Sequence, residues 1–437
     1  MTALRAGNRS VAVIGSGIAG LSAAYLLSAR DHVTLFEADN RAGGHAHTHY
    51  IDRGDGSVVA LDSAFLVHND RTYPTLRRLF NELGVATQAT DMSMSVRDSA
   101  SGFEYAGGQG VAGLFPRLSH VARPRYLMML TEVTRFHRAA LRLLSTTSTD
   151  GEAEEKLGDF LKRHGFSRYF IKYFMTPLVA AVWSCPPGDA MRYPARYLFM
   201  FLEHHGMLSV FGSPTWRTVT GGSANYVNAI VGRVDDVRLA TPVVGVRRVS
   251  GGVELTARGC APTVFDAVVI ATHPDQALMM LAEPSTSERK LLGAMPYTTN
   301  LAQLHTDESV LPRNPRARAS WNYLTTASSD QVLVSYDITR LMELSGPQRF
   351  IVTLGGHDVV KPAAVVAEML YSHPSYTTES VAAQRLLPTL NDDKVVFAGA
   401  YHGWGFHEDG AASGVRAARH LGAEWPSRRS ETEAMAS

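Results

Sequence analysis

Cysteine is almost absent from this chain, which has only Cys185 and Cys260 among its 437 residues. Two thiols exclude a disulfide framework, a four-thiolate zinc site and any Cys-x-x-Cys redox pair, and they fit the reducing cytoplasm, where we expect the protein. An excess of charge is also missing, because 42 Lys and Arg face 41 Asp and Glu. A formal net charge of +1 gives no broad positive field, so we expect no nucleic-acid partner.

Long hydrophobic runs are missing as well. The longest, Leu178–Trp183, lies between Pro177 and Pro186 and is far shorter than the ~20 residues that cross a bilayer. Near the N-terminus, Val11–Ile14 follows two arginines as in a signal peptide, but the run breaks at Gly15 and a helical pattern follows. We therefore expect neither a signal peptide nor a membrane-spanning helix.

The composition that is present fits a large globular enzyme. A length of 437 residues corresponds to two or three domains, and 45% hydrophobic residues suffice for a large core. The pattern predicts a buried strand at Val11–Ile14, a helix at Ile18–Ala29 and a second buried strand at Val33–Glu37, which together form a βαβ unit. The end of the chain repeats the strand-then-helix pattern, with a strand predicted at Lys394–Phe397 and a helix at Ala411–Leu421.

A glycine motif connects the first strand to the helix. In Gly15–Gly20 the glycines follow the GxGxxG spacing of dinucleotide-binding folds. Gly15 permits the tight turn, Gly17 lets the backbone approach a pyrophosphate, and Gly20 lets helix and strand pack closely. Glu37 ends the second strand, where its carboxylate can accept hydrogen bonds from ribose hydroxyls; no basic residue follows it directly, which disfavours a 2′-phosphate.

A second GxGxxG at Gly108–Gly113 tests how specific the spacing is. It has no long strand before it, and Pro116 stands where a helix would continue. We interpret this match as a loop.

A turn shortly after Glu37 indicates which dinucleotide binds. Arg41–Thr48 contains Gly43 and Gly44, which let the backbone pass close to another part of the cofactor, and Arg41 can reach an adenosine ribose or phosphate. Taken alone, the segment also fits a surface turn.

In combination these motifs resemble the FAD-dependent superfamily of amine oxidases, protoporphyrinogen oxidases and phytoene desaturases, which carry GxGxxG, an acidic strand end and an RxGG turn. Further segments match in the same order: Val219–Ser223 before a helix, Val243–Val244 as a strand beside adenine, Ala271–Thr272 as a strand end, and Phe397–Gly414 as the closing motif. The resemblance implies FAD as the cofactor and covers most of the chain.

The resemblance also implies an α/β fold, with a Rossmann-like FAD-binding domain of the GR2 type interleaved with an α+β substrate domain that contains a helical insertion. We assign residues 1–95, 215–290 and 391–425 to the FAD domain and residues 96–214 and 291–390 to the substrate domain, and we expect a disordered tail at 426–437. The insertion, from about Ser119 to Leu208, is rich in aromatic residues and methionines.

The implied cofactor site gathers residues from both ends of the chain. In this superfamily the last helix points its N-terminus at the flavin, which places Asp409, Gly410 and Ala411 beside the ribityl chain and ring. The expected FAD-binding residues are Gly15, Ser16, Gly17, Ile18, Ala19, Gly20, Glu37, Ala38, Arg41, Gly43, Gly44, His45, Val244, Gly399, Asp409, Gly410 and Ala411. The candidate catalytic residues of the closing loop are Tyr401, Trp404 and His407.

A narrower likeness is visible in phrases such as Gly44–Thr48, Asn69–Pro74 and Gly405–Gly410. They resemble a bacterial subgroup of NAD/FAD-binding oxidoreductases that is associated with cyclopropane-fatty-acid-synthase-like methyltransferases and includes desaturases of methyl-branched acyl chains. The resemblance implies a methyltransferase as a partner. This chain departs from the subgroup at Asp62–Phe65 and at His68–Asn69, which should lie near the flavin ring.

Histidines alternate at His45, His47 and His49, and on a strand they would share one face. This spacing invites a metal-site hypothesis, but no carboxylate or thiolate cluster accompanies it, so we expect no metal. A covalent flavin link through His45 is an alternative that the sequence leaves open.

The predicted reaction is hydride removal from a carbon of an apolar substrate, most simply the desaturation of a lipid acyl chain, with reoxidation by oxygen or a quinone. Two alternatives stay open: a flavin amine oxidase, and a flavin-binding isomerase or partner protein without net redox turnover. Arginines from Arg123 to Arg142 fit a basic helix on the inner face of an anionic membrane, and they also fit a solvated helix face.

Overall fold

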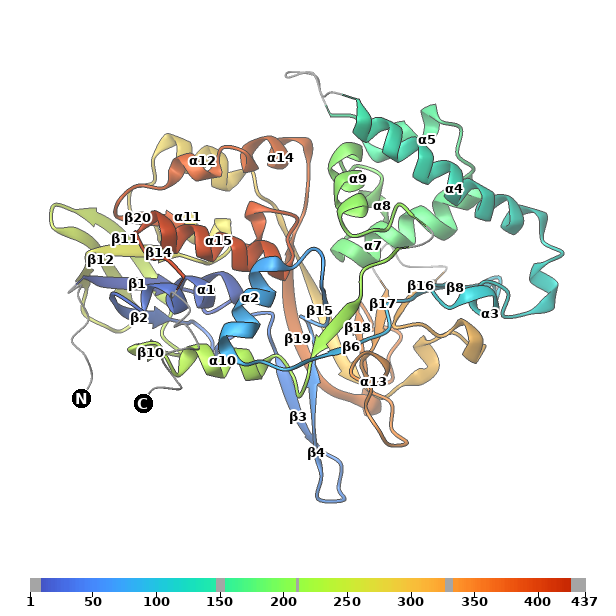
Figure 1. Ribbon diagram of the computed structural model, residues 1–437, viewed down its shortest axis with the longest axis horizontal. Helices are drawn as coiled ribbons and strands as arrows, with labels where there is room; N and C mark the ends of the chain where they lie inside the picture. The colour runs from blue at the N-terminus through green and yellow to red at the C-terminus, as the bar shows by residue number, and fades with distance from the viewer. Residues whose placement is uncertain (1–8, 147–153, 210–211, 327–332, 426–437) are drawn as a thin grey trace, which may run out of the picture.

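The computed structural model describes residues 9–146, 154–209, 212–326 and 333–425 (Figure 1). The predicted tail at 426–437 lies outside the described residues. Within them the chain forms a parallel sheet with helices, a larger mixed sheet and a helical region. The α/β fold class is therefore confirmed.

The parallel sheet has the order β10-β2-β1-β14-β20, in which every neighbouring pair is parallel. Its strands are β1 (Ser10–Ile14), β2 (His32–Phe36), β10 (Asp236–Arg238), β14 (Ala267–Ile270) and β20 (Val395–Phe397). They come from three distant parts of the chain. β1 occupies the centre because Val11–Ile14 is apolar at every position, as a strand covered on both faces requires.

Two different layers cover this sheet. Val11 and Val13 point into a core with four helices, whereas Ala12 and Ile14 point into a core with a three-stranded sheet and three further helices. The first layer holds α1 (Ile18–Leu27), α2 (Pro74–Leu83), α10 (Ala224–Val231) and α15 (His407–His420). The second holds β11 (Val243–Val249), β12 (Gly252–Ala257), β13 (Thr263–Phe265), α11 (Pro274–Met280), α12 (Thr286–Gly293) and α14 (Thr378–Gln384).

The second large sheet has the order β19-β15-β18-β17-β16-β7-β8. Its strands are β7 (Met94–Asp98), β8 (Glu104–Gly107), β15 (Tyr297–His305), β16 (Trp321–Thr325), β17 (Val334–Asp337), β18 (Ile351–Leu354) and β19 (Val365–Pro374), and a short helix, α13 (Ile338–Leu341), follows β17. Inward-facing residues of this sheet share one hydrophobic core with the helical region.

The helical region fills the predicted insertion and forms the upper right of Figure 1. Its helices are α3 (Gly110–Leu114), α4 (Pro124–Ser145), α5 (Leu157–Arg163), α6 (Arg168–Phe170), α7 (Thr176–Trp183), α8 (Pro187–Ala190) and α9 (Ala195–His204), with a 3₁₀ turn η1 (Leu118–His120) and a π-helical turn η2 (Ile171–Met175). Among the described residues, no helix is long and apolar enough to span a bilayer.

Strands β15 and β19 run antiparallel along most of their length between the two halves of the molecule (Figure 1). Beside them lies a hairpin of β3 (Thr48–Asp52) and β4 (Val58–Asp62), and a three-stranded sheet of β5 (His68–Asn69), β6 (Thr87–Ala89) and β9 (Trp216–Val219) follows. The parallel sheet draws its strands from within 1–95, 215–290 and 391–425. The exact division into domains stays a prediction.

Two local predictions need correction. The closing helix starts at His407 rather than Ala411, because the Asp409 carboxylate accepts a hydrogen bond from the Phe406 N–H at 2.9 Å and so closes the first turn. The segment Gly108–Gly113 is not wholly a loop, since it includes the five-residue helix α3. This helix ends before Pro116 and follows an antiparallel edge strand, so it does not form a dinucleotide motif.

Candidate active site

The loop after β1 forms a cradle that is open on one side. Gly15 has φ +97°, and a side chain there would meet the Ala271 carbonyl oxygen at 2.8 Å. A Cβ on Gly20 would lie 1.8 Å from the Gly15 carbonyl oxygen, so only glycine lets the helix approach the strand. A Cβ on Gly17 would meet no protein atom within 4 Å, which leaves room there for a ligand.

Gly17 is also the N-cap of α1, and neither a capping side chain nor an acidic residue satisfies the first turn of this helix. Unpaired N–H groups at a helix start attract an anion. The open space at Gly17 and these free donors therefore fit the pyrophosphate of a dinucleotide. Ile18 and Ala19 form the first turn of α1 and are buried.

Glu37 follows β2 and bends back to this loop. Its carboxylate accepts hydrogen bonds from the backbone N–H and the hydroxyl of Ser16 and, at 2.9 Å, from the Asp39 N–H. The carboxylate is thereby fixed beside the cradle and remains partly exposed, as ribose recognition requires. Ala38 beside it is exposed, and so is Val244, which lies at a bulge of β11.

The Arg41–Gly44 turn lies directly on the cradle. The Gly43 N–H donates to the Ser16 carbonyl oxygen at 3.1 Å, and a Cβ on Gly44 would lie 3.1 Å from the Gly17 Cα. The Arg41 guanidinium donates to the Gly44 carbonyl at 2.8 Å, so that it folds over its own turn. Gly43 and Gly44 both have positive φ, which explains the glycine pair.

The closing segment reaches the same place from the other end of the chain. A Cβ on Gly410 would lie 2.7 Å from Ile18 Cγ2, and one on Gly414 would lie 2.0 Å from the Ala19 carbonyl oxygen. The first turns of α15 and α1 are therefore in direct contact. Gly399 lies two residues after β20 and donates its N–H to the Ser413 hydroxyl at 2.9 Å, which ties the end of the strand to the helix.

Asp409 is one of two acidic residues in the first turn of α15, and Ala411, two residues further on, is buried. Burial raises the pKa of Asp409 to about 7. Glu408 beside it accepts hydrogen bonds from the Thr75 and Leu76 N–H groups at 2.9 Å each, which joins α15 to the start of α2.

A chain of hydrogen bonds follows the Arg41–Gly44 turn. His47 Nδ1 lies 2.9 Å from the Tyr371 hydroxyl, which lies 2.7 Å from Ser63 Oγ, which in turn lies 2.9 Å from His49 Nε2. The His47 and His49 rings stack at 4.1 Å. Burial lowers the pKa of His49 and brings that of His47 to about 3, so both rings are neutral at pH 7.

His45 stands at the buried end of this group. Its ring lies 5.0 Å from Tyr371 and 5.2 Å from His373, and its Nε2 is buried without a hydrogen-bond partner among the described residues. Burial lowers the pKa of His45 well below its usual value and that of His373 to about 4. No cluster of three metal-ligating side chains occurs within the described ranges.

The segment Asp62–Phe65, where the sequence departs from the subgroup pattern, lies against the histidine turn. The Ser63 N–H donates to the His47 carbonyl at 3.0 Å, and the Phe65 N–H donates to the His45 carbonyl at 2.9 Å. The Asp62 carboxylate is buried and accepts hydrogen bonds from Ser223 and Thr48. Burial raises the pKa of Asp62 to about 6.

The structure separates the three catalytic candidates. Tyr401 is 1% exposed, packs into the core on the β11–β13 side, and its hydroxyl has no partner among the described residues. His407 stacks on Phe65 at 3.8 Å with an angle of 6°, and its Nε2 lies 2.7 Å from the Tyr226 hydroxyl. Burial lowers the pKa of His407 to about 3.

Trp404 alone of the three faces the helical region. Its ring lies 5.1 Å from His204, and its Nε1 is buried without a partner among the described residues. Next to it, Phe406 stacks on Phe201 at 4.8 Å. The Trp183 N–H donates to the Trp404 carbonyl at 3.1 Å and joins α7 to the closing segment.

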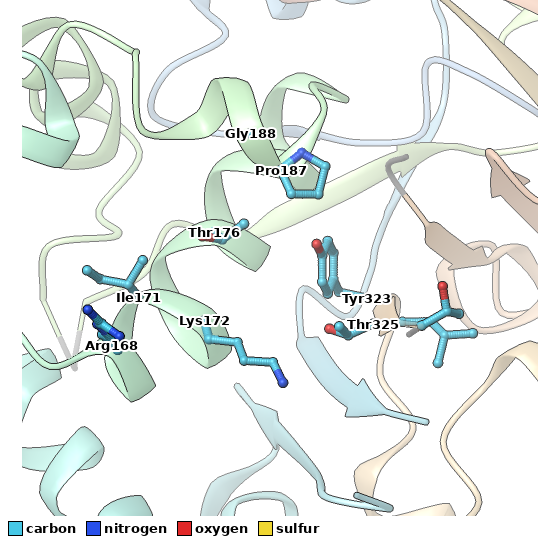
Figure 2. Close-up of a pocket in the computed structure, with 10 residues that line it drawn as sticks. Arg168, Ile171, Lys172, Thr176, Pro187, Gly188, Tyr323 and Thr325 are labelled. Atoms are coloured by element: carbon cyan, nitrogen blue, oxygen red, sulfur yellow. The ribbon is translucent and has the colours of Figure 1, made fainter. Parts of the chain in front are cut away.

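A cavity of about 390 Å³ lies further along the helical region. Figure 2 shows Arg168, Ile171, Lys172 and Thr176 on one wall and Tyr323 on the opposite strand. Thr176, which lines the cavity, and Trp183, which contacts the closing segment, are the two ends of α7 and lie about 10 Å apart at 1.5 Å per residue. The Lys172 ammonium pairs with Asp98 at 3.1 Å.

Sequence reasoning did not find Tyr371 and His373. They lie on β19, more than 320 residues from the histidine turn, and the alternation of a strand places both on one face. The sequence signal that could have indicated them is the spacing of Tyr371 and His373, two polar ring side chains two residues apart in a strand.

The fold and this site define a two-part protein with a dinucleotide cradle made from both ends of the chain. The sequence profile described as "Flavin containing amine oxidoreductase" matches residues 18–341. The chain therefore belongs to the flavin-containing amine oxidoreductase family, and FAD is its cofactor. FAD would be held at Gly17, where a Cβ would meet no protein atom, and at the first turns of α1 and α15, which contact each other.

Individual proteins are similar to this chain in sequence or in fold. The chain is similar to protoporphyrinogen oxidase 2, chloroplastic/mitochondrial, of Arabidopsis thaliana, with 27% identity over 49% of this chain and 41% of that protein. The chain thus spans less than half of that relative. Its fold is similar to cyclohexylamine oxidase from Brevibacterium oxydans IH-35A (TM-score 0.66, 18% identity, 95% and 98% of the chains) and to a CLA-producing fatty acid isomerase from P. acnes (TM-score 0.65, 14% identity, 93% and 97%).

Proposed function

We propose that this protein is an FAD-dependent oxidoreductase that introduces a double bond into an apolar substrate, with a lipid acyl chain as the substrate class. One hydrogen leaves the chain as a hydride and a proton leaves the adjacent carbon, so that a C=C bond forms. When bound, FAD supplies the hydride acceptor, and oxygen or a quinone is the proposed final oxidant.

The observation that carries the proposal is the aromatic wall where the closing segment meets the helical region. The rings of Trp404 and Phe406 contact Phe201, and Phe406 lies 6.4 Å from Trp183. These side chains carry no charge. Trp183 and Phe201 are buried, whereas Trp404 and Phe406 stay partly exposed and give the closing segment an apolar face, which suits a hydrocarbon chain better than a polar molecule.

Proton removal is assigned to the hydrogen-bonded chain of His47, Tyr371, Ser63 and His49. Each histidine has one ring nitrogen 2.9 Å from a hydroxyl of this chain, so a proton can move along it by way of neutral rings and hydroxyls. The Tyr371 hydroxyl can pass a proton between His47 Nδ1 and Ser63 Oγ, because it lies within 2.9 Å of both. His49 is partly exposed and gives the proton a way out to solvent.

The cavity gives further support for a lipid. Ile171, Pro187 and Leu324 provide apolar lining, while Arg168 and Lys172 add positive charge. A chain that lies along α7 would extend from these cations to the aromatic wall. The fold likeness to a fatty acid isomerase is consistent with an acyl substrate. The resemblance to the bacterial subgroup further suggests that a methyltransferase acting on acyl chains is a partner of this protein.

Anaerobic reduction of the bound flavin tests the proposal. We expect fatty acyl substrates to bleach the flavin absorption of the purified protein and a desaturated product to appear by mass analysis. Trp404→Ala should raise KM about tenfold or more, since losing one buried aromatic contact costs about 1–3 kcal/mol, whereas Trp404→Phe should stay near the native value. Flavin that no acyl substrate bleaches would contradict the proposal, and a shifted double bond without bleaching would favour an isomerase.

Amine oxidation is the second candidate, because a tyrosine pair adjoins the closing segment. The Tyr197 and Tyr376 rings lie 5.0 Å apart, and both hydroxyls donate to the Gly403 carbonyl at 2.8 Å. Aromatic faces attract an ammonium ion, and the cyclohexylamine oxidase has the same fold. Bleaching by alkylamines but not by acyl chains would favour this candidate.

A further inference from the structure

The end of the molecule formed by α3, η1 and the start of α4 exposes aliphatic side chains. We call them the apolar tip: Val111 (75% exposed), Leu118 (91%), Val121 (57%), Leu127 (37%) and Met128 (47%). They lie within a segment that has no Asp or Glu from Tyr105 to Thr131. Figure 1 shows this segment at the opposite end from the parallel sheet. Single exposed aliphatic residues are ordinary, but a group of this kind marks a contact surface.

The backbone that carries the apolar tip is firmly held. The Tyr126 hydroxyl donates to the Leu114 carbonyl at 2.7 Å, and the Phe103 ring packs edge-on against Tyr126 at 5.2 Å. The Asn314 amide donates to the Pro116 carbonyl at 2.8 Å. The tip therefore points outward because the fold places it there.

Arginines lie at the apolar tip and along α4, which leads away from it. Arg117 and Arg123 flank η1, and further exposed arginines on α4 and the adjoining segment are Arg125, Arg135, Arg138, Arg142, Arg313 and Arg316. Within the described part of the chain, the side chains of Arg125, Arg138 and Arg142 make no hydrogen bond or ion pair. Glu132, the only acidic residue of α4, is buried and is bound by Ser167 and Arg135.

We propose that this end of the protein docks on an anionic lipid bilayer, with the apolar tip inserted below the headgroups and the arginines on the lipid phosphates. Burial of aliphatic side chains and attraction to anionic lipids are the two contributions that hold a protein at a membrane surface. A second copy of this face would bring like charges together, which disfavours self-association here.

The cavity lies beside this surface. The Phe103 ring, over which Arg123 lies at 5.5 Å, is also in contact with Tyr169 at 6.0 Å and Tyr173 at 5.2 Å. Their chain neighbours Arg168 and Lys172 line the cavity. Docking would therefore present the cavity to the bilayer as the entry for an acyl chain. This last step rests on the proposed function, whereas the membrane contact itself does not.

Vesicle sedimentation with the flavin-loaded full chain tests the docking. We expect the protein to pellet with vesicles of phosphatidylcholine and phosphatidylglycerol, much less with phosphatidylcholine alone, and less at high salt. Leu118→Glu combined with Val121→Glu, and separately Arg125→Glu combined with Arg138→Glu, should each weaken partitioning about tenfold or more. Met279→Glu and Arg258→Glu are matched controls on the FAD-domain side and should bind as the native protein does.

Native protein that stays in the supernatant with anionic vesicles would overturn the docking, as would tip variants that bind like the native protein. An oligomer that the tip variants dissociate would identify a protein interface instead and would also overturn it. Unchanged flavin absorption shows that each variant is folded. Because sedimentation needs no turnover, failure of the proposed reaction and failure of the docking are told apart.

Discussion

The indole N–H of Trp183 donates a hydrogen bond to the main-chain carbonyl of Trp404 at 3.1 Å. Trp183 ends α7, whose other end lines the cavity, and Trp404 belongs to the closing segment that leads into α15. A contact between residues 221 positions apart thus joins the helical region to the closing segment. Because the carbonyl is fixed at this point, the orientation of the aromatic wall depends on the helical insertion.

Gly17 and Gly20 should respond differently to the same substitution. Gly17→Ala introduces no clash with protein atoms and occupies an allowed backbone conformation, so the thermal stability of the FAD-free protein should stay unchanged while FAD binds about tenfold or more weakly. Gly20→Ala should lower both, because its Cβ would lie 1.8 Å from the Gly15 carbonyl. Flavin fluorescence and calorimetry measure the two quantities. Full FAD affinity in Gly17→Ala would place the pyrophosphate elsewhere.

Asp409 should make stability fall as pH rises. Burial raises its pKa to about 7 in the folded state, above an ordinary value of 3.8, so the folded state holds the proton over a range in which the unfolded state has lost it. The free energy of unfolding should therefore decrease from about pH 4 to pH 7 and then level off. Asp409→Asn should flatten this slope in denaturant titrations with saturating FAD, while Asp393→Asn at an exposed position should leave it intact.

Tyr371→Phe should slow the reaction without weakening substrate binding. The change removes the hydroxyl between His47 and Ser63 and leaves the ring in place. Interrupted proton transfer costs about 10²-fold or more in rate, so we expect a lower rate of flavin reduction with little change in KM. The control is Tyr50→Phe, which changes an exposed tyrosine of β3 that lies outside the hydrogen-bonded chain. A native rate in Tyr371→Phe would remove this chain from the mechanism.

His407→Ala should affect folding more than chemistry. The substitution removes the stack on Phe65 and the hydrogen bond to Tyr226, and a buried contact of this kind contributes about 1–3 kcal/mol. Its Nε2 is paired with the Tyr226 hydroxyl at 2.7 Å and its ring is stacked on Phe65, so His407 is not part of the hydrogen-bonded chain of His47 and His49. We expect a lower melting temperature and a rate of flavin reduction, per bound flavin, within about twofold of native. A large loss of rate in a variant with native stability would restore His407 as a catalytic residue.

Local patterns were enough to predict the strand, the glycine turn and the helix at the start of the chain. Gly15–Gly20 and Glu37 belong to one βαβ unit, in which a strand, a tight turn and a helix are contiguous, so spacing alone places the glycines at the start of α1. The resemblance carried the prediction across the chain to Gly410. The start of α15 was placed four residues late, because Asp409 closes the first turn by accepting from the Phe406 N–H.

The surroundings of the candidate catalytic residues were harder to predict. Tyr401, Trp404 and His407 stand within seven residues of one another, yet a short turn sends them into three different cores. Tyr371 and His373 approach His45 only because β19 pairs with β15 along the boundary between the two halves. Local sequence patterns do not show which distant strands pair, because the partner of β19 is fixed only when the whole sheet assembles and β15 accepts it at the edge.

The sequence by itself determined the scarcity of cysteine and the balance of charge, and through its glycine motif it determined the tight turn between β1 and α1. These properties follow from composition and from contacts between neighbours in the chain. Only the tertiary structure decided that the 27 acid-free residues from Tyr105 to Thr131 form a basic, aliphatic end of the molecule. Exposure belongs to the packed fold, because Leu118 and Tyr126 are both apolar and only packing leaves one in solvent and buries the other.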